Sequence, residues 1–275
     1  MSITVWKIDA STIAPLAFPE SDFDSITKRL PAGLYTTFRT FAQHTKVIGL
    51  GAHLARLYQP AKDLGMAIVR TQRELRQILG QLLNSMGTDE ARLRIVLDTT
   101  SEPGTLYVMT QPFQILSEKL YHEGVHVVLS TSSRDEPRLK KTQFISSSAF
   151  ERERIGEDVF EILLTHRGRI LEGMTSNFFY VREDTLGTAA RGVLLGVTRG
   201  TVLALARLTK MRVRYRALPC DEIAAITEAF ITSSSRGIVP IARIEDRNIG
   251  SAGQVTRKLM EMYDRQLCSL AKPIV

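Results

Sequence analysis

The residues of greatest chemical interest stand in the segment 172–177, which reads Glu-Gly-Met-Thr-Ser-Asn and is flanked by two apolar, strand-like runs. An acid, a glycine and three polar side chains at such a junction favour a loop that holds a small polar ligand. Glu172, Ser176 and Asn177 are therefore candidate binding residues. The segment predicts a ligand site in the second half of the chain.

A pair of lysines, Lys140 and Lys141, supplies an amine in the same half of the chain. Adjacent lysines usually form a solvated surface pair. An amine attacks an aldehyde only in its neutral form, and burial or a neighbouring ammonium group favours that form. Glu172 suits the same chemistry, because a carboxylate that faces a pyridine nitrogen keeps the nitrogen protonated and makes the ring an electron sink.

Three further features suit a phosphate group. The sequence Gly-Val-Thr-Arg at 196–199 precedes a helical pattern, and the amide groups at a helix N-terminus attract an anion. The serines at 233–235 follow a strand and offer hydroxyl and amide donors, while Arg56 provides a countercharge. Each feature alone is ordinary capping, loop or surface chemistry, but their order together with Lys140 and Glu172 indicates a site for pyridoxal phosphate.

The composition excludes several classes of protein. The chain has 275 residues, enough for one large or two moderate domains, and its 44% hydrophobic and 24% charged residues are ordinary for a globular protein. Its apolar runs are too short to span a membrane, and its first residues lack the basic start and apolar core of a signal peptide. Cys220 and Cys268 form neither a disulfide framework nor a metal-ligand cluster. We therefore expect a cytoplasmic protein without a metal site.

The net charge of +7 and the pI of about 9.5 raise the alternative of a nucleic-acid-binding protein. Basic and acidic residues are mixed along the chain, however, and neither a basic tail nor a nucleic-acid motif accompanies them. Nucleic-acid binding is therefore a remote alternative. A basic surface also favours anionic small substrates.

The hydrophobic pattern predicts an α+β chain. In the first half it predicts strands at 1–9, 33–41, 93–97 and 105–110 and helices at 50–64 and 75–83. In the second half it predicts strands at 125–130, 159–164, 178–181 and 228–232, helices at 144–155, 198–208 and 253–270, and a hairpin turn at 165–169. The short polar stretch after Pro112 suggests a tight link, so we expect domains at 1–112 and 124–275 that are joined by 113–123.

Taken in order, these pieces resemble the class IV (fold type IV) pyridoxal-phosphate enzymes, which include branched-chain aminotransferases, D-amino acid aminotransferases and 4-amino-4-deoxychorismate lyase. The resemblance begins near Gly33, runs to the C-terminus and is strongest from Lys140 to Pro240. Its matching pieces are His-Leu-Ala-Arg-Leu at 53–57, Lys140 with Phe-Ile at 144–145, Glu-Gly at 172–173, Ser-Asn at 176–177, Gly-Val-Thr-Arg at 196–199, and Phe-Ile-Thr-Ser-Ser-Ser at 230–235.

The resemblance implies a role for each matched residue. Lys140 corresponds to the Schiff-base lysine, with Lys141 as the alternative, and Glu172 corresponds to the acid at the pyridine nitrogen. The other matched residues are Arg56, Val197, Thr198 and Ser234 for the phosphate, Ser176 and Asn177 around the cofactor, and Tyr35 and Arg39 for the substrate. The resemblance also implies a two-domain α+β fold of type IV, with pyridoxal phosphate between the domains, and a homodimer whose pocket the neighbouring subunit completes.

Some departures from the family pattern bear on the activity. Branched-chain enzymes carry a tyrosine where this chain has Phe144, and their Gly-Asp-Gly before the early strand is Pro-Ala-Gly at 31–33. The D-amino acid enzymes have an Arg and a His as a carboxylate trap where this chain has Asp-Thr-Thr-Ser at 98–101, which argues against that subfamily. Tyr-Thr-Thr at 35–37 is similar to the lyase, whereas Thr198 is closer to the aminotransferases.

The activity that the resemblance implies is transamination between an amino acid, branched-chain-like or another small donor, and a 2-oxo acid, in ping-pong order. Lys140, once the substrate amine has displaced it, acts as a general base at the substrate's α-carbon. The alternative is a 4-amino-4-deoxychorismate lyase, which uses the same cofactor and lysine but releases pyruvate and 4-aminobenzoate.

Overall fold

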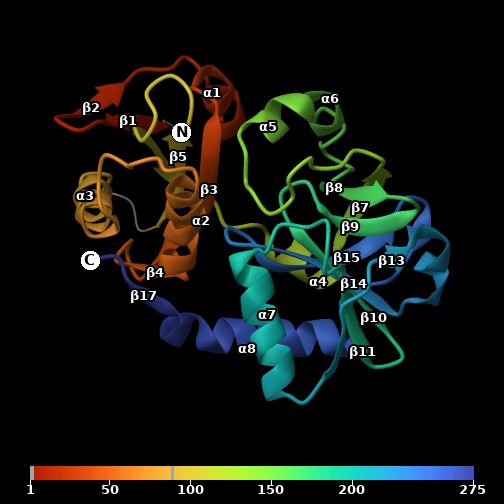
Figure 1. Cartoon of the computed structure of the whole chain (residues 1–275). Helices are drawn as coiled ribbons and strands as arrows, with labels where there is room; N and C mark the ends of the chain where they lie inside the picture. Colours follow the sequence, from red (N-terminus) through yellow and green to blue (C-terminus); the bar gives the residue numbers. More distant parts are fainter. Residues whose placement is uncertain (1–2, 88–89) are drawn as a thin grey trace. The chain divides into compact units, whose positions relative to one another are not determined.

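The computed structural model describes residues 3–87 and 90–275 and separates into two compact units (Figure 1). Unit 1 consists of Met1–Gln114, Leu139–Ser147 and Cys268–Val275. Unit 2 consists of Ile115–Arg138 and Ser148–Leu267. The domain boundaries expected from the sequence stay a prediction. They place one domain at 1–112, a link at 113–123 and a second domain at 124–275.

Unit 1 is built on an antiparallel sheet with the strand order β17-β4-β3-β5-β6-β1-β2. These strands are β1 (Thr4–Ile8), β2 (Ile13–Leu16), β3 (Gly33–Phe41), β4 (Lys46–Ile48), β5 (Ala91–Asp98), β6 (Leu106–Pro112) and β17 (Ala271–Pro273). The inner strand β3 alternates its side chains between the two faces, so Tyr35 and Arg39 share one face and Thr36 lies on the other.

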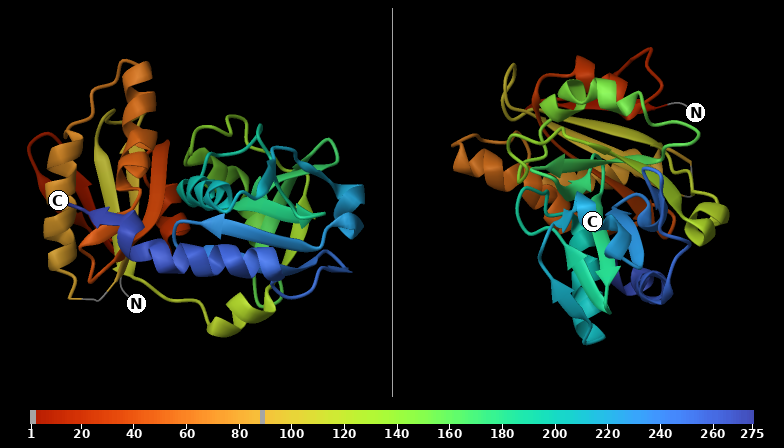
Figure 2. Two further views of the ribbon diagram at one scale, coloured as in Figure 1. Left: turned by 90° about the horizontal axis from the view of Figure 1, so that it is seen from below. Right: turned by 90° about the vertical axis from the view of Figure 1, so that its right-hand side faces the viewer.

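Helices pack on both faces of this sheet (Figure 2). On one face lie α2 (Leu50–Asp63) and α3 (Gln72–Asn84), whose leucines at spacings of three and four enter the main core. The start of α3 has a capping box, in which Thr71 and Glu74 satisfy each other's backbone amides. On the other face, α1 (Phe23–Arg29) and α5 (Gln143–Ser147) enclose a second cluster that includes Tyr35.

Unit 2 contains a sheet with the strand order β12-β11-β10-β14-β15-β7-β8-β9-β13, and β16 pairs with β15. An additional pairing of β9 with β10 joins the two ends of the run from β10 to β9, which closes these six strands on themselves. The strands are β7 (Val125–Ser130), β8 (Glu161–His166), β9 (Arg169–Gly173), β10 (Asn177–Arg182), β11 (Thr185–Thr188), β12 (Arg212–Arg214), β13 (Leu218–Pro219), β14 (Glu228–Ser233), β15 (Gly237–Ile244) and β16 (Arg247–Asn248).

The helices of unit 2 are α4 (Glu118–Glu123), α6 (Ala149–Arg152), α7 (Val197–Leu208) and α8 (Gln254–Leu270), with a 3-10 helix at Cys220–Ala225. Between the strands, aromatic side chains stabilise the central pairing: the rings of Phe179 and Phe230 face each other across β10 and β14 with centroids 4.9 Å apart. Within the described ranges, the structure has no helix with the length and apolarity needed to cross a membrane.

Two expectations about local structure were wrong. The helix expected at 144–155 is divided into α5 and α6 at Ser148, whose φ of −101° and ψ of 17° leave the helical conformation. Glu172 lies at the end of β9 rather than in a loop, so the loop is only Met174–Ser176. Within the expected link at 113–123, the residues Glu118–Glu123 form α4.

Candidate active site

Lys140 is held in unit 1 beside the first residues of β3. The amide of Tyr35 donates a hydrogen bond of 2.8 Å to the carbonyl oxygen of Lys140. Two residues further on, the amide of Thr142 donates to the carbonyl of Gly33, and the Thr142 hydroxyl accepts from the Gly33 amide. The Nζ atom of Lys140 lies 4.9 Å from the centre of the Tyr35 ring. The lysine backbone is therefore fixed, and its side chain lies over an aromatic face.

The two expected substrate residues, Tyr35 and Arg39, share a face of β3 and have different surroundings. Tyr35 is buried, and the guanidinium carbon of Arg94 lies 4.8 Å from the centre of its ring. The guanidinium carbon of Arg39 lies 4.3 Å from the centre of the Phe41 ring and 4.5 Å from that of Phe113. Aromatic contacts on both residues restrict their side chains, which suits groups that must present one geometry to a substrate.

Arg56 lies one helical turn after His53 on α2, so the two side chains share a face of that helix. His53 is fully buried, and its Nδ1 shares a hydrogen bond of 2.7 Å with the Thr36 hydroxyl. Burial holds the pKa of His53 well below its ordinary value of 6.5, and the positive charges of Arg56 and Lys140 lower it further. The electrostatic field of both cations thus reaches the same buried histidine in unit 1.

Glu172 is the central acid of unit 2, and its carboxylate is buried and oriented through both oxygens. Oε1 accepts a hydrogen bond of 2.9 Å from Nε of Arg134. Oε2 accepts from the Leu194 amide at 2.9 Å and from Nδ2 of Asn177 at 3.2 Å. A carboxylate with donors on both oxygens keeps one orientation, which suits a group that must face a ligand atom.

Asn177 joins this carboxylate to the start of α7. Its Nδ2 also donates to the carbonyl of Leu194 at 2.7 Å, and a Cβ atom on Gly196 would lie 2.1 Å from its Oδ1. Glycine at 196 is therefore required by this close approach. As the N-cap of α7, Gly196 has no side chain with which to cap the first-turn amides, which include those of Val197 and Thr198. Such amides suit an anionic group.

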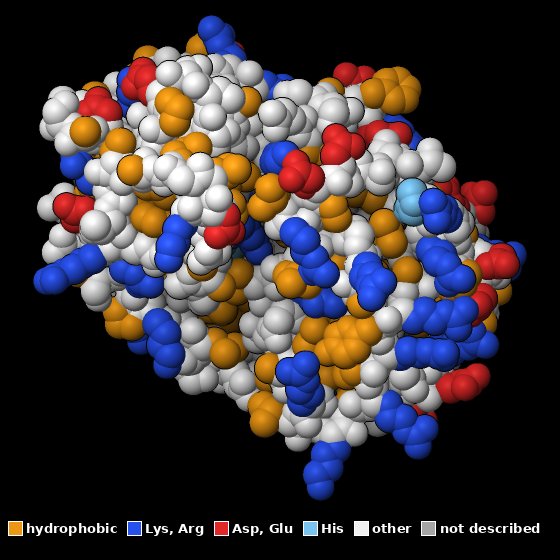
Figure 3. Space-filling view, in the orientation of Figure 1, with side chains coloured by type: hydrophobic (Ala, Val, Ile, Leu, Met, Phe, Trp, Pro, Cys, Tyr) orange, Lys and Arg blue, Asp and Glu red, His pale blue; other side chains and the backbone are white. Residues whose placement is uncertain are grey.

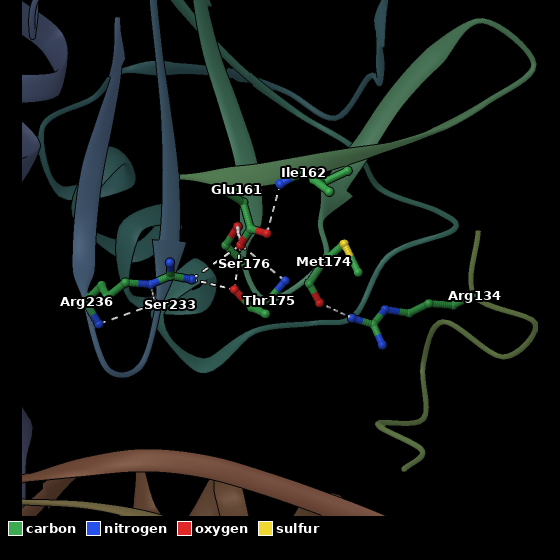
Figure 4. A network of polar contacts seen from close by, with 8 residues as sticks. All are labelled: Arg134, Glu161, Ile162, Met174, Thr175, Ser176, Ser233 and Arg236. Carbon is green, nitrogen blue, oxygen red and sulfur yellow. Dashed lines mark hydrogen bonds and ion pairs between the residues drawn. The ribbon is translucent and has the colours of Figure 1, made fainter. Parts of the chain in front are cut away.

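The loop that follows Glu172 is fastened by a second buried acid, Glu161 (Figure 4). Its Oε2 accepts from the hydroxyl and the amide of Thr175 and, at 3.1 Å, from the hydroxyl of Ser176. Nη2 of Arg236 donates to the same oxygen at 3.3 Å, and Nε of Arg236 donates to Ser233 at the end of β14. This network connects the loop Met174–Ser176 with the turn between β14 and β15.

The predicted site residues fall into three groups. Unit 1 brings Lys140 next to Tyr35, with Arg39 on the same strand and Arg56 on α2; Lys141 pairs with Leu34 at the edge of β3. Unit 2 brings Glu172, Asn177, Val197 and Thr198 together at the start of α7. Ser176 belongs to the Glu161 network, and Ser234 is half-buried in the turn that Arg236 shares.

Sequence reasoning missed three residues of these networks. Arg134 stands in a polar loop, where a basic residue has the same pattern as a solvated one, so no local signal distinguishes it. Arg236 follows a run of serines and is equally ordinary. Glu161 had a usable signal, because it is an acid inside an apolar strand-like run, and buried acids require partners.

Comparison with known proteins identifies the family. Residues 33–244 match the model of the family described as amino-transferase class IV, and the chain belongs to this family. A probable branched-chain-amino-acid aminotransferase of Thermotoga maritima is 28% identical over 255 residues, which cover 88% of this chain and 89% of the relative. An aminodeoxychorismate lyase of Bacillus subtilis is also 28% identical, over 86% of this chain and 85% of the relative.

The fold agrees with solved structures of the same kind. A branched-chain aminotransferase of the archaeon Thermoproteus uzoniensis, solved with norvaline, superimposes with a TM-score of 0.79 at 22% identity and covers 99% of both chains. Another solved branched-chain aminotransferase, with a TM-score of 0.82 at 20% identity, contains pyridoxamine 5'-phosphate. The expected α+β fold of type IV is confirmed, and so is the expected class IV enzyme that depends on pyridoxal phosphate.

The residues of this chain fit that cofactor. Pyridoxal phosphate carries an aldehyde, a pyridine nitrogen and a phosphate, and each needs a different partner. A lysine is fixed beside Tyr35, and a buried, oriented carboxylate is provided by Glu172. The start of α7, where a glycine is required by the close approach of Asn177, presents amides to an anion.

Proposed function

We propose that this enzyme transfers an amino group between a branched-chain-like or other small amino acid and a 2-oxo acid. The single observation that carries the proposal is the buried Glu172 carboxylate, oriented by Asn177 and Leu194 next to the start of α7. When bound, pyridoxal phosphate supplies an aldehyde for the substrate amine and an electron sink for the charge left at the substrate's α-carbon.

Lys140 is the proposed catalytic residue. Its Nζ would hold the cofactor covalently until a substrate amine takes its place. The freed lysine amine would then act as the base that takes the proton from the substrate's α-carbon. The hydrogen bonds from the Tyr35 amide to Lys140 and from the Thr142 amide to Gly33 fix the backbone at the lysine and two residues after it.

The other proposed roles concern binding. Glu172 would pair with the pyridine nitrogen, while Asn177 and Ser176 hold the acid and its loop. For the phosphate, unit 2 would provide the amides and hydroxyl at Val197 and Thr198 and the hydroxyl of Ser234, and unit 1 would provide the charge of Arg56. Tyr35 and Arg39 contact the substrate. A basic surface, on which Lys and Arg side chains are prominent (Figure 3), favours substrates that carry a carboxylate.

A carboxylate trap of the kind found in the D-amino acid enzymes has no counterpart in the described turn after β5. Asp98 stands there instead, fully buried, and accepts from the amides of Thr100, Ser101 and Glu102 at 2.7, 3.0 and 2.8 Å. An acid that closes its own turn does not attract a substrate carboxylate. This observation favours the branched-chain-like substrates.

The lyase remains the second candidate, because a lyase is among the relatives and Tyr-Thr-Thr at 35–37 is similar to that subfamily. Inside unit 1, the hydroxyl of Thr36 bonds to His53, and that of Thr37 accepts from Nε of Arg94 at 3.1 Å. Thr198, which is closer to the aminotransferases, supports the transaminase over the lyase. We further propose a cytoplasmic homodimer, for which light scattering of the purified protein is the first check.

Absorbance spectra of wild type, Lys140→Ala and the matched control Lys141→Ala, each with pyridoxal phosphate, test the function. We expect the band of lysine-bound cofactor in wild type and Lys141→Ala and its absence in Lys140→Ala. L-Leucine or L-glutamate alone should bleach the band of a transaminase, whereas a lyase releases pyruvate and keeps it. No band in wild type would reject both enzymes, and a band lost only in Lys141→Ala would move the catalytic role to that residue.

A further inference from the structure

Arg134 is a buried cation bound directly to the proposed acid. It lies on the segment after β7 and points toward the loop Met174–Ser176 (Figure 4). Its Nε donates to Oε1 of Glu172 at 2.9 Å, and its Nη2 donates to the carbonyl of Met174 at 2.6 Å. The side chains of Arg134 and Glu172 are 5% and 2% exposed, so water screens this pair very little.

Support of the loop does not by itself account for a buried guanidinium. Thr175 and Ser176 are already fastened by Glu161, through hydrogen bonds that do not involve Arg134. Burying a charge is costly, and a neutral donor would satisfy the Met174 carbonyl equally well. The feature that only a cation supplies is its charge next to Glu172.

That charge decides where a shared proton resides. A buried carboxylate without a cation tends to take up a proton itself, because burial disfavours its charged form. A neutral Glu172 would leave the pyridine nitrogen unprotonated, whereas an ionised Glu172 holds the proton on the ring. Arg199 is a second buried cation whose charge interacts with Glu172, but its Nη2 donates to the carbonyl of Ala189. Arg134, in contrast, is hydrogen-bonded to the acid itself.

We propose that Arg134 is a positioning residue that keeps Glu172 ionised and in place, so that the proton shared by Glu172 and the pyridine nitrogen stays on the nitrogen. The inference rests on the proposed function and deepens it. It accounts for the strength of the electron sink through a residue that touches neither the substrate nor the reacting atoms. Removing the charge moves one proton from the ring to Glu172 and changes no covalent bond to carbon.

The test uses the full-length enzyme reconstituted with pyridoxal phosphate labelled with nitrogen-15 in the ring, whose chemical shift reports protonation of that nitrogen. Arg134→Met removes the charge. Arg138→Met is the matched control, since exposed Arg138 lies in the same segment and donates to the carbonyl of Ala190 rather than to Glu172. Arg134→Gln, which keeps a donor for the Met174 carbonyl, serves as the second neutral variant if Arg134→Met does not fold.

We expect wild type and Arg138→Met to show a protonated ring and the neutral variants to move toward the unprotonated position. In the same variants kcat should fall on the order of tenfold or more, with KM little changed. On a Glu172→Gln background, Arg134→Met should add no further change. Arg134→Lys, which keeps the charge, should restore most of the ring signal.

Three results would overturn the inference: an unprotonated ring in wild type, a wild-type signal in the folded neutral variants, or an equal effect of Arg134→Met with and without Glu172. Failure of the proposed function is a different result, because wild type would then lack the absorbance band of lysine-bound cofactor before any ring signal is measured.

Discussion

Glu172 and Asn177 are register partners of β9 and β10, and the same two side chains are joined by a hydrogen bond of 3.2 Å. This single pairing closes the run of strands in unit 2 on itself. Glu172, the acid proposed to bind the cofactor, therefore lies where the sheet closes. Only three residues, Met174–Ser176, separate β9 from β10 there. Closure of the sheet and orientation of the acid depend on the same residues.

Replacement of Gly196 should weaken cofactor binding. In Gly196→Ala the new Cβ would lie 2.1 Å from Oδ1 of Asn177, so Asn177 must move and lose its hydrogen bonds to Glu172 and Leu194. We expect affinity for pyridoxal phosphate to fall by about tenfold, which corresponds to about 1.4 kcal/mol. Titration with the cofactor, followed by absorbance, measures the change.

Gly200→Ala, on the same helix α7, is the matched control. A Cβ there meets nothing within 4 Å, and alanine is favoured over glycine in a helix interior by roughly 0.5–1 kcal/mol. We expect normal cofactor affinity and a slightly raised melting temperature. Equal affinities of the two alanine variants for pyridoxal phosphate would contradict the proposed role of the close approach between Gly196 and Asn177.

Truncation of Tyr35 should affect Lys140 through the ring and not through the hydroxyl. The Lys140 Nζ lies 4.9 Å from the ring centre, so the ring restricts the position of the amine without using the tyrosine hydroxyl. Tyr35→Phe should therefore bind pyridoxal phosphate as wild type does, while Tyr35→Ala should bind it roughly two- to fivefold more weakly.

Tyr107→Ala separates this effect from a general loss of packing, since Tyr107 is buried in the same cluster as Tyr35. Both alanine variants should lose stability in urea unfolding, by about 3–5 kcal/mol, because each leaves a cavity. Only Tyr35→Ala should change cofactor affinity. A similar loss of affinity in Tyr107→Ala would attribute the effect to the cavity.

His53 should make the stability of the chain depend on pH. In the folded chain its pKa is well below 6.5, so between that value and about pH 6.5 the unfolded state binds more protons than the folded state. The free energy of unfolding should therefore fall as the pH falls below about 6.5, by up to about 1.4 kcal/mol per pH unit. Above that pH, His53 contributes no slope because it is neutral in both states.

Urea unfolding of His53→Gln and of wild type from about pH 7.5 to about pH 5.5 measures this slope. The variant should be less stable near neutral pH, since it loses the contact with Thr36, but should show a shallower dependence on pH. His166→Gln, at an exposed position, should keep the wild-type slope. Identical slopes in wild type and His53→Gln would disprove the assignment.

Glu161→Gln should destabilise unit 2 and loosen the loop after Glu172. The carboxylate accepts from Thr175, Ser176 and Arg236, and an amide in its place would direct a donor toward other donors. We expect a loss of roughly 2–4 kcal/mol in the free energy of unfolding.

The control for Glu161→Gln is Glu157→Gln, which changes an exposed acid in the same region of the chain and should shift stability by less than about 0.5 kcal/mol. Amide hydrogen exchange at Thr175 provides a local readout, since its N–H donates to Glu161 and should exchange faster in Glu161→Gln. Unchanged exchange at this amide would mean that the acid does not hold the loop.

The sequence by itself determined the types of most elements and suggested the chemistry of the site. The spacing of apolar residues predicted α2, α3 and α7, aromatic and β-branched residues predicted β3, and alternation predicted β5, because these signals arise within a few residues of chain. Residue types offered an amine at Lys140 or Lys141 and an acid at Glu172, and the resemblance to the family selected Lys140. Local reasoning failed for the helix at 144–155, where Ser148 leaves the helical conformation.

Only the tertiary structure decided which of these groups are buried and what they contact. Arg134 binds Glu172 from a position 38 residues away in the chain, and Arg236 reaches Glu161 across 75 residues. Contacts of this kind depend on strand order and register, which no local pattern encodes. The closure of β9 on β10 places Glu172. Burial then makes its charged partners important, because two charges interact more strongly in the protein interior than in water.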